Sequence, residues 1–192
     1  MKKEKFKRCG WCLSDPQYIE YHDKEWGVPV FQDEKLFEFL VLEGAQAGLS
    51  WLTILKRREG YRKAFMNFNA EKVAKMNEKQ IKKLLQDTSI IGNQAKIRAT
   101  VSNAQAFLKI QEEFGSFSEY SWGFVDGKPI ISRRKNLRDI PPTSKESDQF
   151  SQDLKQRGFK FVGSTIMYAH MQAVGMVNDH LTDCFRHKEV QK

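Results

Sequence analysis

The sequence predicts an all-α protein, and two patterns support this class. Apolar residues recur at helical spacing in several segments, and Ser, Asn or Asp residues stand at the starts of these segments. Alternation of apolar and polar residues, which a half-buried strand would show, never lasts long enough to build a sheet. The chain also lacks internal repeats and low-complexity tracts. We therefore expect one helical domain over residues 1–192.

The first clear helix is predicted over residues 33–43, where Asp33 stands near the start. The second half of this segment is an unbroken apolar run, so the helix should be buried on nearly all sides rather than amphipathic. Gly44 and Gly48 then loosen the chain. Ser50 is a typical N-cap residue and predicts a second helix that covers residues 51–59.

Three further helices are predicted in the middle of the chain, over residues 70–76, 78–87 and 94–114. Asn69 and Asn77 stand at N-cap positions, and Gly115 is a typical C-terminal stop.

The stretch 116–142 is rich in Pro and Gly and is the best candidate for a connection between two lobes. Ser144 or Ser147 should begin the next helix, which Gly158 ends, and a last helix is expected over roughly 163–174.

Composition and charge narrow the class of protein. The chain has 192 residues, of which 40% are hydrophobic, so disordered and disulfide-rich chains are excluded. Lys and Arg number 32 against 24 Asp and Glu, a net charge of +8 that favours a polyanionic partner without requiring one. The basic start has no apolar segment behind it, and no apolar run is long enough to span a membrane, so we expect a cytoplasmic protein without a membrane partner. Residues 1–7 should be a flexible basic tip.

Cysteine and histidine residues gather at the two ends of the chain. His180 and Cys184 are spaced to share one face of a helical turn, and Cys9 and His22 supply a second pair from the other end. Two thiolates and two imidazoles suit tetrahedral Zn²⁺. The spacing fits buried, metal-free cysteines and histidines equally well. Cys12 forms a C-x-x-C motif with Cys9, which admits another ligand set or a redox pair.

The segment TSIIGNQAKI separates two predicted helices and carries Gly92 and Asn93. A turn of this kind, followed by the free amides of a helix N-terminus, can bind a DNA phosphate, as in a helix–hairpin–helix motif. The match is incomplete because one glycine stands where two are usual, and an ordinary helix–helix link explains the segment as well.

Glu43 ends an apolar run and shares a helix face with Leu36 and Leu40. A carboxylate there is costly to bury unless it meets a ligand, although it could also turn to solvent at the helix end. Aromatic residues crowd the surrounding sequence: Trp11, Tyr18, Tyr21, Trp26 and Trp51. Flat rings beside a half-buried acid, in a basic protein, are what a pocket for a flipped nucleic-acid base needs.

Four blocks of the sequence, in this order, resemble the 3-methyladenine DNA glycosylase I family of bacterial base excision repair enzymes: RCGW, DPQYIEYHDKEWGVP, LEGAQAGLSW and GFKFVGSTIMYAHMQAVGMVNDH. The resemblance covers nearly the whole chain. It implies an all-α fold of the helix–hairpin–helix glycosylase superfamily with two helical lobes, in which one structural zinc ion joins the N- and C-terminal segments.

The resemblance also implies roles for individual residues. The zinc ligands would be Cys9, His22, His180 and Cys184, which excludes Cys12. The residues acting on the base would be Glu43 and Tyr21 as catalytic residues, Trp51 and Trp11 as stacking partners and Tyr18 as part of the pocket wall. The DNA-binding residues would be Gly48 and Leu49, which fill the gap left by the base, and Gly92 and Asn93 of the hairpin.

The function implied by the resemblance is hydrolytic release of 3-methyladenine from alkylated double-stranded DNA by a monomeric enzyme. The superfamily usually has an Asp about twenty residues after the hairpin glycine; here that neighbourhood reads KIQEE, and no Lys is placed as a nucleophile, so no lyase activity is expected. Two other functions fit parts of the sequence: a zinc-containing DNA-binding module without catalysis, and a thiol oxidoreductase that uses Cys9 and Cys12.

Overall fold

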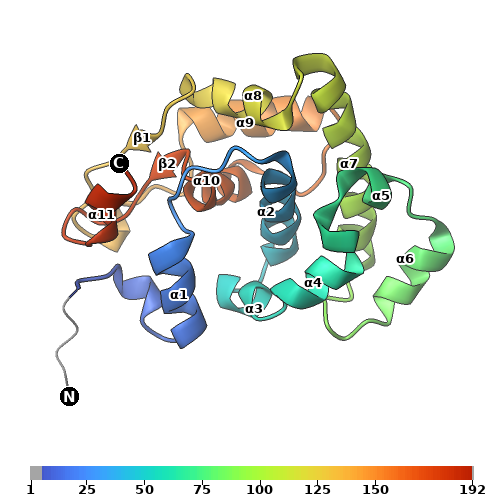
Figure 1. Cartoon of the computed structure of the whole chain (residues 1–192), viewed down its shortest axis with the longest axis horizontal. Coiled ribbons are helices and arrows are strands. Elements are labelled where there is room, and N and C mark those ends of the chain that lie inside the picture. Colours follow the sequence, from blue (N-terminus) through green and yellow to red (C-terminus); the bar gives the residue numbers. More distant parts are fainter. Residues whose placement is uncertain (1–5, 192) are drawn as a thin grey trace.

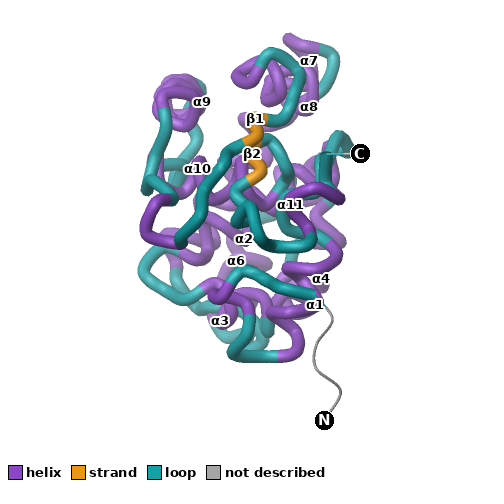
Figure 2. The backbone as a smooth tube through the Cα atoms, turned by 90° about the vertical axis from the view of Figure 1, so that its left-hand side faces the viewer, coloured by secondary structure: helices purple, strands orange, loops and turns teal. Residues whose placement is uncertain are grey.

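The computed structural model describes residues 6–191, and its regular structure is almost entirely helical (Figures 1 and 2). The helices of the first half are α1 (Pro16–Lys24), α2 (Asp33–Gln46), α3 (Trp51–Leu55), α4 (Arg58–Ala64), α5 (Ala70–Ala74) and α6 (Glu78–Leu85). Those of the second half are α7 (Gln94–Phe114), α8 (Phe117–Trp122), α9 (Lys145–Gln156), α10 (Ser164–Ala173) and α11 (Arg186–Glu189). Four short 3₁₀ segments lie at Gly10–Cys12, Met66–Phe68, Gly123–Val125 and Leu137–Asp139.

The predicted helix boundaries are confirmed where a capping side chain sets them. The side chains of Ser50 and Asn69 accept hydrogen bonds from backbone N–H groups of α3 and α5. Ser144 is the N-cap of α9, and Ser147, the alternative start, is its partner in a capping box. Gly115 ends α7 with a φ of 85°, a conformation that glycine adopts without steric cost.

The structure departs from the predicted elements in four places. The helix expected over 51–59 is broken, because α3 ends at Leu55 and α4 begins only at Arg58. Helices α1, α8 and α11 were not predicted from periodicity, since α8 and α11 are too short to show a repeating pattern. The connection 116–142 is therefore partly helical. His180 and Cys184 lie in an irregular turn rather than on a helix.

Helix α2 occupies the centre of the molecule and is packed against α10, α7, α3 and α8 (Figure 1). Its residues from Leu36 to Glu43 are all buried, as the apolar run predicted. Because α2 is surrounded on every side, the carboxylate of Glu43 is carried into the interior rather than to the surface.

The N- and C-terminal parts of the described residues meet, with α1 and α11 on the same side of the molecule (Figure 1). The backbone N–H of Phe185 donates a hydrogen bond of 3.0 Å to the carbonyl oxygen of Lys7, and the ring of Phe6 packs on Phe185. Residues 1–5 of the predicted basic tip lie outside the described residues. A small parallel pair of strands, β1 (Ile130–Ile131) and β2 (Val177–Asn178), adds to the helical fold near α11 (Figure 2).

Among residues 6–191, no helix combines the length and the apolar character that crossing a membrane would require.

Candidate functional site

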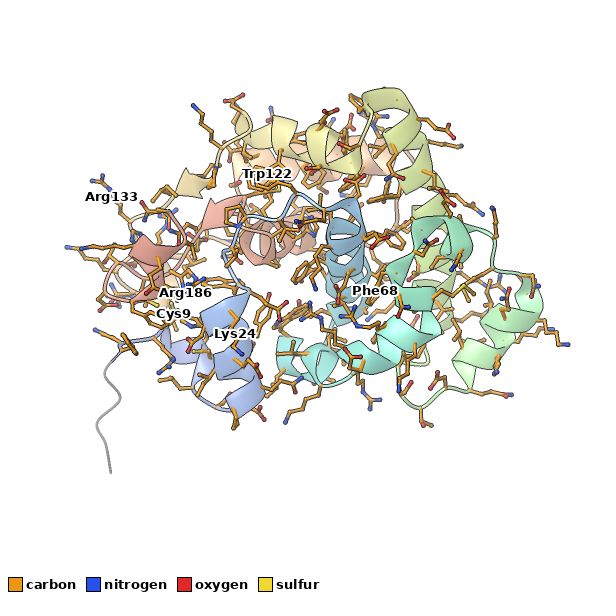
Figure 3. The ribbon with its side chains drawn as sticks, in the orientation of Figure 1. Cys9, Lys24, Phe68, Trp122, Arg133 and Arg186 are labelled. Atoms are coloured by element: carbon orange, nitrogen blue, oxygen red, sulfur yellow. The ribbon has the colours of Figure 1, made fainter. Side chains whose placement is uncertain are left out.

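The four predicted metal ligands come together in one buried cluster. The ligand atoms of Cys9, His22, His180 and Cys184 lie within 4.8 Å of one another, and all four side chains are buried. Figure 3 shows Cys9 beside α1 and close to Arg186 of α11, where the N- and C-terminal segments meet. The cluster therefore connects the two ends of the chain.

The donor set fits a tetrahedral zinc ion. The Sγ atom of Cys184 lies 3.5 Å from His22 Nε2 and 3.7 Å from His180 Nδ1, and Cys9 Sγ lies 3.8 Å from His180 Nδ1. Ordinary Zn–S and Zn–N bond lengths place sulfur and nitrogen about 3.6 Å apart in a tetrahedron. Each ring is also oriented by its other nitrogen: His22 Nδ1 donates to Asp23 at 2.8 Å, and His180 Nε2 donates to the Trp26 carbonyl at 2.8 Å. Such partners are typical of metal-bound histidines.

Cys12 lies outside this cluster. Its thiol donates a hydrogen bond of 3.1 Å to the carbonyl oxygen of Cys9, and burial raises its pKa to about 11. A thiol of this kind is neutral at physiological pH and is a poor nucleophile or metal ligand. The geometry favours the four-residue ligand set over one that includes Cys12.

A pocket of about 330 Å³ opens beside the metal cluster. All five predicted base-contacting residues line it: Trp11, Tyr18, Tyr21, Glu43 and Trp51. The remaining lining residues are Trp26, Gln46, Leu137, Ile140, Ala169 and Gln172. None of the described residues that line this pocket is Lys or Arg, and Glu43 is the carboxylic acid among them.

The pocket walls are aromatic. The ring of Trp11 lies 4.8 Å from that of Tyr18 and 5.0 Å from that of Trp26, and the ring of Tyr21 lies 5.5 Å from that of Trp51. Tyr21 is 3% exposed, and its pKa is raised well above the ordinary value. Burial is the main cause, and the negative charge of the nearby Glu43 carboxylate is the second. Tyr21 is therefore a neutral hydroxyl, able to donate a hydrogen bond into the pocket.

Glu43 is 4% exposed, and burial raises the pKa of its carboxyl group to about 8. No neighbouring positive charge contributes to this shift, in contrast to Glu38 on the same helix, which is paired with Arg58. The pocket lining consequently stabilises the ionised form of this carboxyl group poorly. A cationic ligand would supply the missing positive charge and favour the ionised form.

The raised pKa of Glu43 predicts a pH-dependent cost in stability. The folded protein keeps a proton on Glu43 that the unfolded chain releases above about pH 4.5, so this group contributes stability at low pH that is lost as pH rises towards about 8. We expect Glu43→Gln to change the melting temperature little near pH 4.5 and to raise it, relative to the unsubstituted protein, by several degrees near about pH 9. Calorimetry across this range checks the sign. A difference that does not grow with pH would show that Glu43 is already stabilised as an anion.

The cluster of Cys and His side chains adjoins the pocket walls directly. Trp11 lies in the 3₁₀ segment Gly10–Cys12, which begins directly after Cys9, and Tyr21 directly precedes His22 on α1. The carbonyl of Trp26 is the hydrogen-bond partner of His180. Trp11, Tyr21 and Trp26 of the pocket wall are thus each next to a predicted metal ligand, either along the chain or through one hydrogen bond.

The predicted DNA-binding residues lie on the surface. Gly48, with a φ of 79°, and Leu49, which is 39% exposed, form the loop after α2. With Thr165 and Ile166, this loop borders a groove that shares Glu43 and Ala169 with the pocket. Leu49 therefore lies on an exposed groove that adjoins the pocket.

The predicted hairpin residues Gly92 and Asn93 are exposed, and the Asn93 side chain caps α7 by accepting from Lys96 N–H. The two basic residues that follow, Lys96 and Arg98, both interact with other groups of the protein. Lys96 Nζ donates to the carbonyls of Ala45 and Ala47 at the end of α2, and Arg98 pairs with Glu78. Lys96 thus holds the loop of Gly48 and Leu49 in place rather than adding a free charge beside the hairpin.

Some pocket residues were not found from the sequence. Gln46 lies one helical turn after Glu43, so helical spacing could have placed it on the same wall. Leu137, Ala169 and Gln172 come from segments more than ninety residues away from Glu43, and nothing in the local sequence connects them with it.

Comparison with known proteins agrees with this geometry. A family model described as methyladenine glycosylase matches residues 11–187. The chain is 49% identical over 177 residues to DNA-3-methyladenine glycosylase 1 of Escherichia coli (strain K12), covering 92% of this chain and 95% of that protein. A crystal structure of a 3-methyladenine DNA glycosylase I superposes with a TM-score of 0.91 at 51% identity, covering 93% of this chain and 98% of the other. A second, the Staphylococcus aureus enzyme in a study of 3-methyladenine recognition, has a TM-score of 0.90 at 41% identity, covering 93% and 95% of the two chains. Similarity of this extent, in sequence and in backbone, is what a shared family produces, and the chain belongs to the methyladenine glycosylase family.

Proposed function

We propose that this protein is a monofunctional DNA glycosylase that hydrolyses the bond between deoxyribose and 3-methyladenine in alkylated double-stranded DNA. The observation that carries the proposal is a buried carboxyl group, without a cationic partner, in an aromatic pocket of a methyladenine glycosylase family member. Among alkylated bases, 3-methyladenine in DNA is cationic, so the charge of the base and that of Glu43 are complementary.

In the proposed reaction, the protein extrudes the damaged nucleotide and holds its base between Trp11 and Trp51, with Tyr18 on the wall. Water attacks C1′ as the bond from C1′ to the base breaks, through a transition state in which deoxyribose resembles an oxocarbenium ion. The bonding electrons pass to the base, which thereby loses its positive charge and leaves as a neutral molecule. The proton of the attacking water passes to solvent. A leaving group of this kind needs little protonation, which accounts for catalysis without the Asp usual in the superfamily.

Glu43 and Tyr21 act in this scheme as recognition groups. The Glu43 carboxylate accepts a hydrogen bond from the edge of the base, and the Tyr21 hydroxyl donates one. Because ionised Glu43 is costly in the pocket, a neutral adenine gains less from binding there than a cationic one. Selectivity for the damaged base therefore comes from charge and fit.

DNA binding is proposed to use the exposed elements around the pocket entrance. Leu49, with Gly48, would enter the stack in place of the extruded base. The surface turn at Gly92 and Asn93, at the start of α7, would bind a backbone phosphate as the hairpin of this superfamily does. The protein is proposed to act as a cytoplasmic monomer.

The cluster of Cys9, His22, His180 and Cys184 is proposed to bind one structural Zn²⁺ per chain. The ion would tie the two chain ends together and take no part in the reaction, since all four ligand side chains are buried and complete a tetrahedral set.

Chromatography of the bases released from dimethyl-sulfate-treated DNA tests the function. We expect free 3-methyladenine to appear with time and enzyme concentration, without cleavage of the DNA backbone. A zinc-containing DNA-binding module would retain the DNA but release no base, and a thiol oxidoreductase would do neither. Retention of every base in the DNA would therefore reject the proposal.

A further inference from the structure

The pocket has a polar residue on its wall that recognition by Glu43 and Tyr21 leaves unused. Gln172, near the end of α10, lines the pocket, and its Nε2 donates a hydrogen bond of 2.8 Å to Asp179 Oδ2. Asp179 is 1% exposed, and the hydroxyl of Tyr168 donates to the same oxygen at 2.6 Å. These three side chains form a buried hydrogen-bonded series that ends at the pocket.

This series fixes which end of the Gln172 amide faces the pocket. An amide has a donor at one end and an acceptor at the other, so holding Nε2 against Asp179 leaves Oε1 as the group available to a ligand. A half-turn of the amide would place Oε1 against the Asp179 oxygen, acceptor facing acceptor. Tyr168 in turn keeps the carboxyl group from rotating away. Gln172 therefore presents an oriented hydrogen-bond acceptor.

Gln172 lies on the part of α10 that lines the pocket but not the neighbouring groove. Thr165 and Ile166, at the start of α10, border the groove together with Leu49. Ala169 lines both the groove and the pocket, whereas Gln172 lines the pocket and is absent from the groove lining. Three residues of helix correspond to about 4.5 Å, so Gln172 lies that much further along α10 from the groove than Ala169 does.

We propose that Gln172 is a specificity-determining residue that accepts a hydrogen bond from one N–H of the exocyclic amino group of the extruded adenine, whose other N–H is left for Glu43, and that Asp179 and Tyr168 are positioning residues that hold Gln172 in this orientation. The inference rests on the proposed glycosylase function and deepens it. Adenine carries an amino donor at C6, where guanine carries a carbonyl acceptor. Oε1 of Gln172 therefore attracts 3-methyladenine and opposes 3-methylguanine, although both bases are cationic in DNA and carry the methyl group at the same nitrogen.

Competition between the two bases in one DNA sample tests the proposal. Dimethyl-sulfate-treated DNA contains both lesions, and mass spectrometry measures the release of each by the unsubstituted protein and by Gln172→Met, Tyr168→Phe and Gln105→Met. Gln105 donates to the carbonyl of Ala74 away from the pocket, so its variant is a matched control for exchanging Gln for Met. The ratio of the two rates does not depend on the fraction of protein that is folded.

We expect Gln172→Met to lower kcat/KM for 3-methyladenine by about tenfold, the usual effect of losing one hydrogen bond, and to leave that for 3-methylguanine unchanged or raised. Tyr168→Phe, which keeps Gln172 but frees Asp179, should shift the ratio in the same direction by a smaller factor. Gln105→Met should keep the original ratio.

An unchanged ratio for Gln172→Met, with 3-methyladenine still released, would overturn the role of Gln172. An unchanged ratio for Tyr168→Phe, where Gln172→Met does change it, would overturn the positioning role. Failure of the proposed function gives a different result, because the unsubstituted protein would then release neither base.

Discussion

Glu43→Gln should lower the rate of 3-methyladenine excision from alkylated DNA by about 100-fold or more while the protein stays folded. The side chain keeps its size and a hydrogen-bonding end, but it loses the negative charge that the cationic base would meet. The pocket lining offers no other charged group to replace it. Single-turnover release of 3-methyladenine, measured beside the melting temperature, checks the effect on chemistry and on stability in the same preparation.

Glu34→Gln is the matched control, since Glu34 lies on α2 but is exposed at its first turn. This variant should excise at the unsubstituted rate. If Glu43→Gln excised 3-methyladenine as fast as the control, the carboxylate would have no role in recognition, and the aromatic walls alone would account for binding.

Cys184→Ala should remove the metal and lower the melting temperature by roughly 10 °C, because a structural zinc site contributes its binding free energy to folding. The excision rate should fall with it. Trp11 and Tyr21 adjoin ligand positions and Trp26 is hydrogen-bonded to His180, so loss of the ion should loosen the pocket walls. Elemental analysis of the purified protein gives the metal content, and calorimetry gives the stability.

Cys12→Ala serves as the control for thiol removal in the same region. Cys12 is buried and donates to the carbonyl of Cys9, but it lies outside the ligand cluster. We expect it to retain about one zinc per chain. Full metal content in Cys184→Ala, or loss of metal in Cys12→Ala, would reject the proposed ligand set.

Much of the fold was predictable from local signals. The caps at Ser50, Asn69 and Ser144 set helix starts because a side-chain oxygen satisfies backbone N–H groups within the same few residues. Burial of α2 followed from its apolar run, whereas the sequence left open whether Glu43 was buried or turned to solvent, and the structure shows it buried. The break between α3 and α4 was not predictable, because residues 51–59 contain no Pro or Gly to mark it.

The candidate site also combines features that the sequence predicted with features that only the fold revealed. The residue pattern suggested Glu43, the aromatic residues and the four Cys and His residues as candidates, and the resemblance gave them roles and excluded Cys12 as a ligand. The fold placed the first group in one pocket and the second within metal-binding distance.

By itself, then, the sequence determined the helical class and the family, and it predicted which acid and which aromatic residues would line one pocket. Only the tertiary structure decided that Lys96 supports the end of α2, that the metal cluster adjoins the pocket walls, and that Gln172 is oriented by Asp179 and Tyr168. The physical reason is that caps and apolar periodicity act between residues a few positions apart, whereas these contacts form between helices that meet only when the core closes around α2.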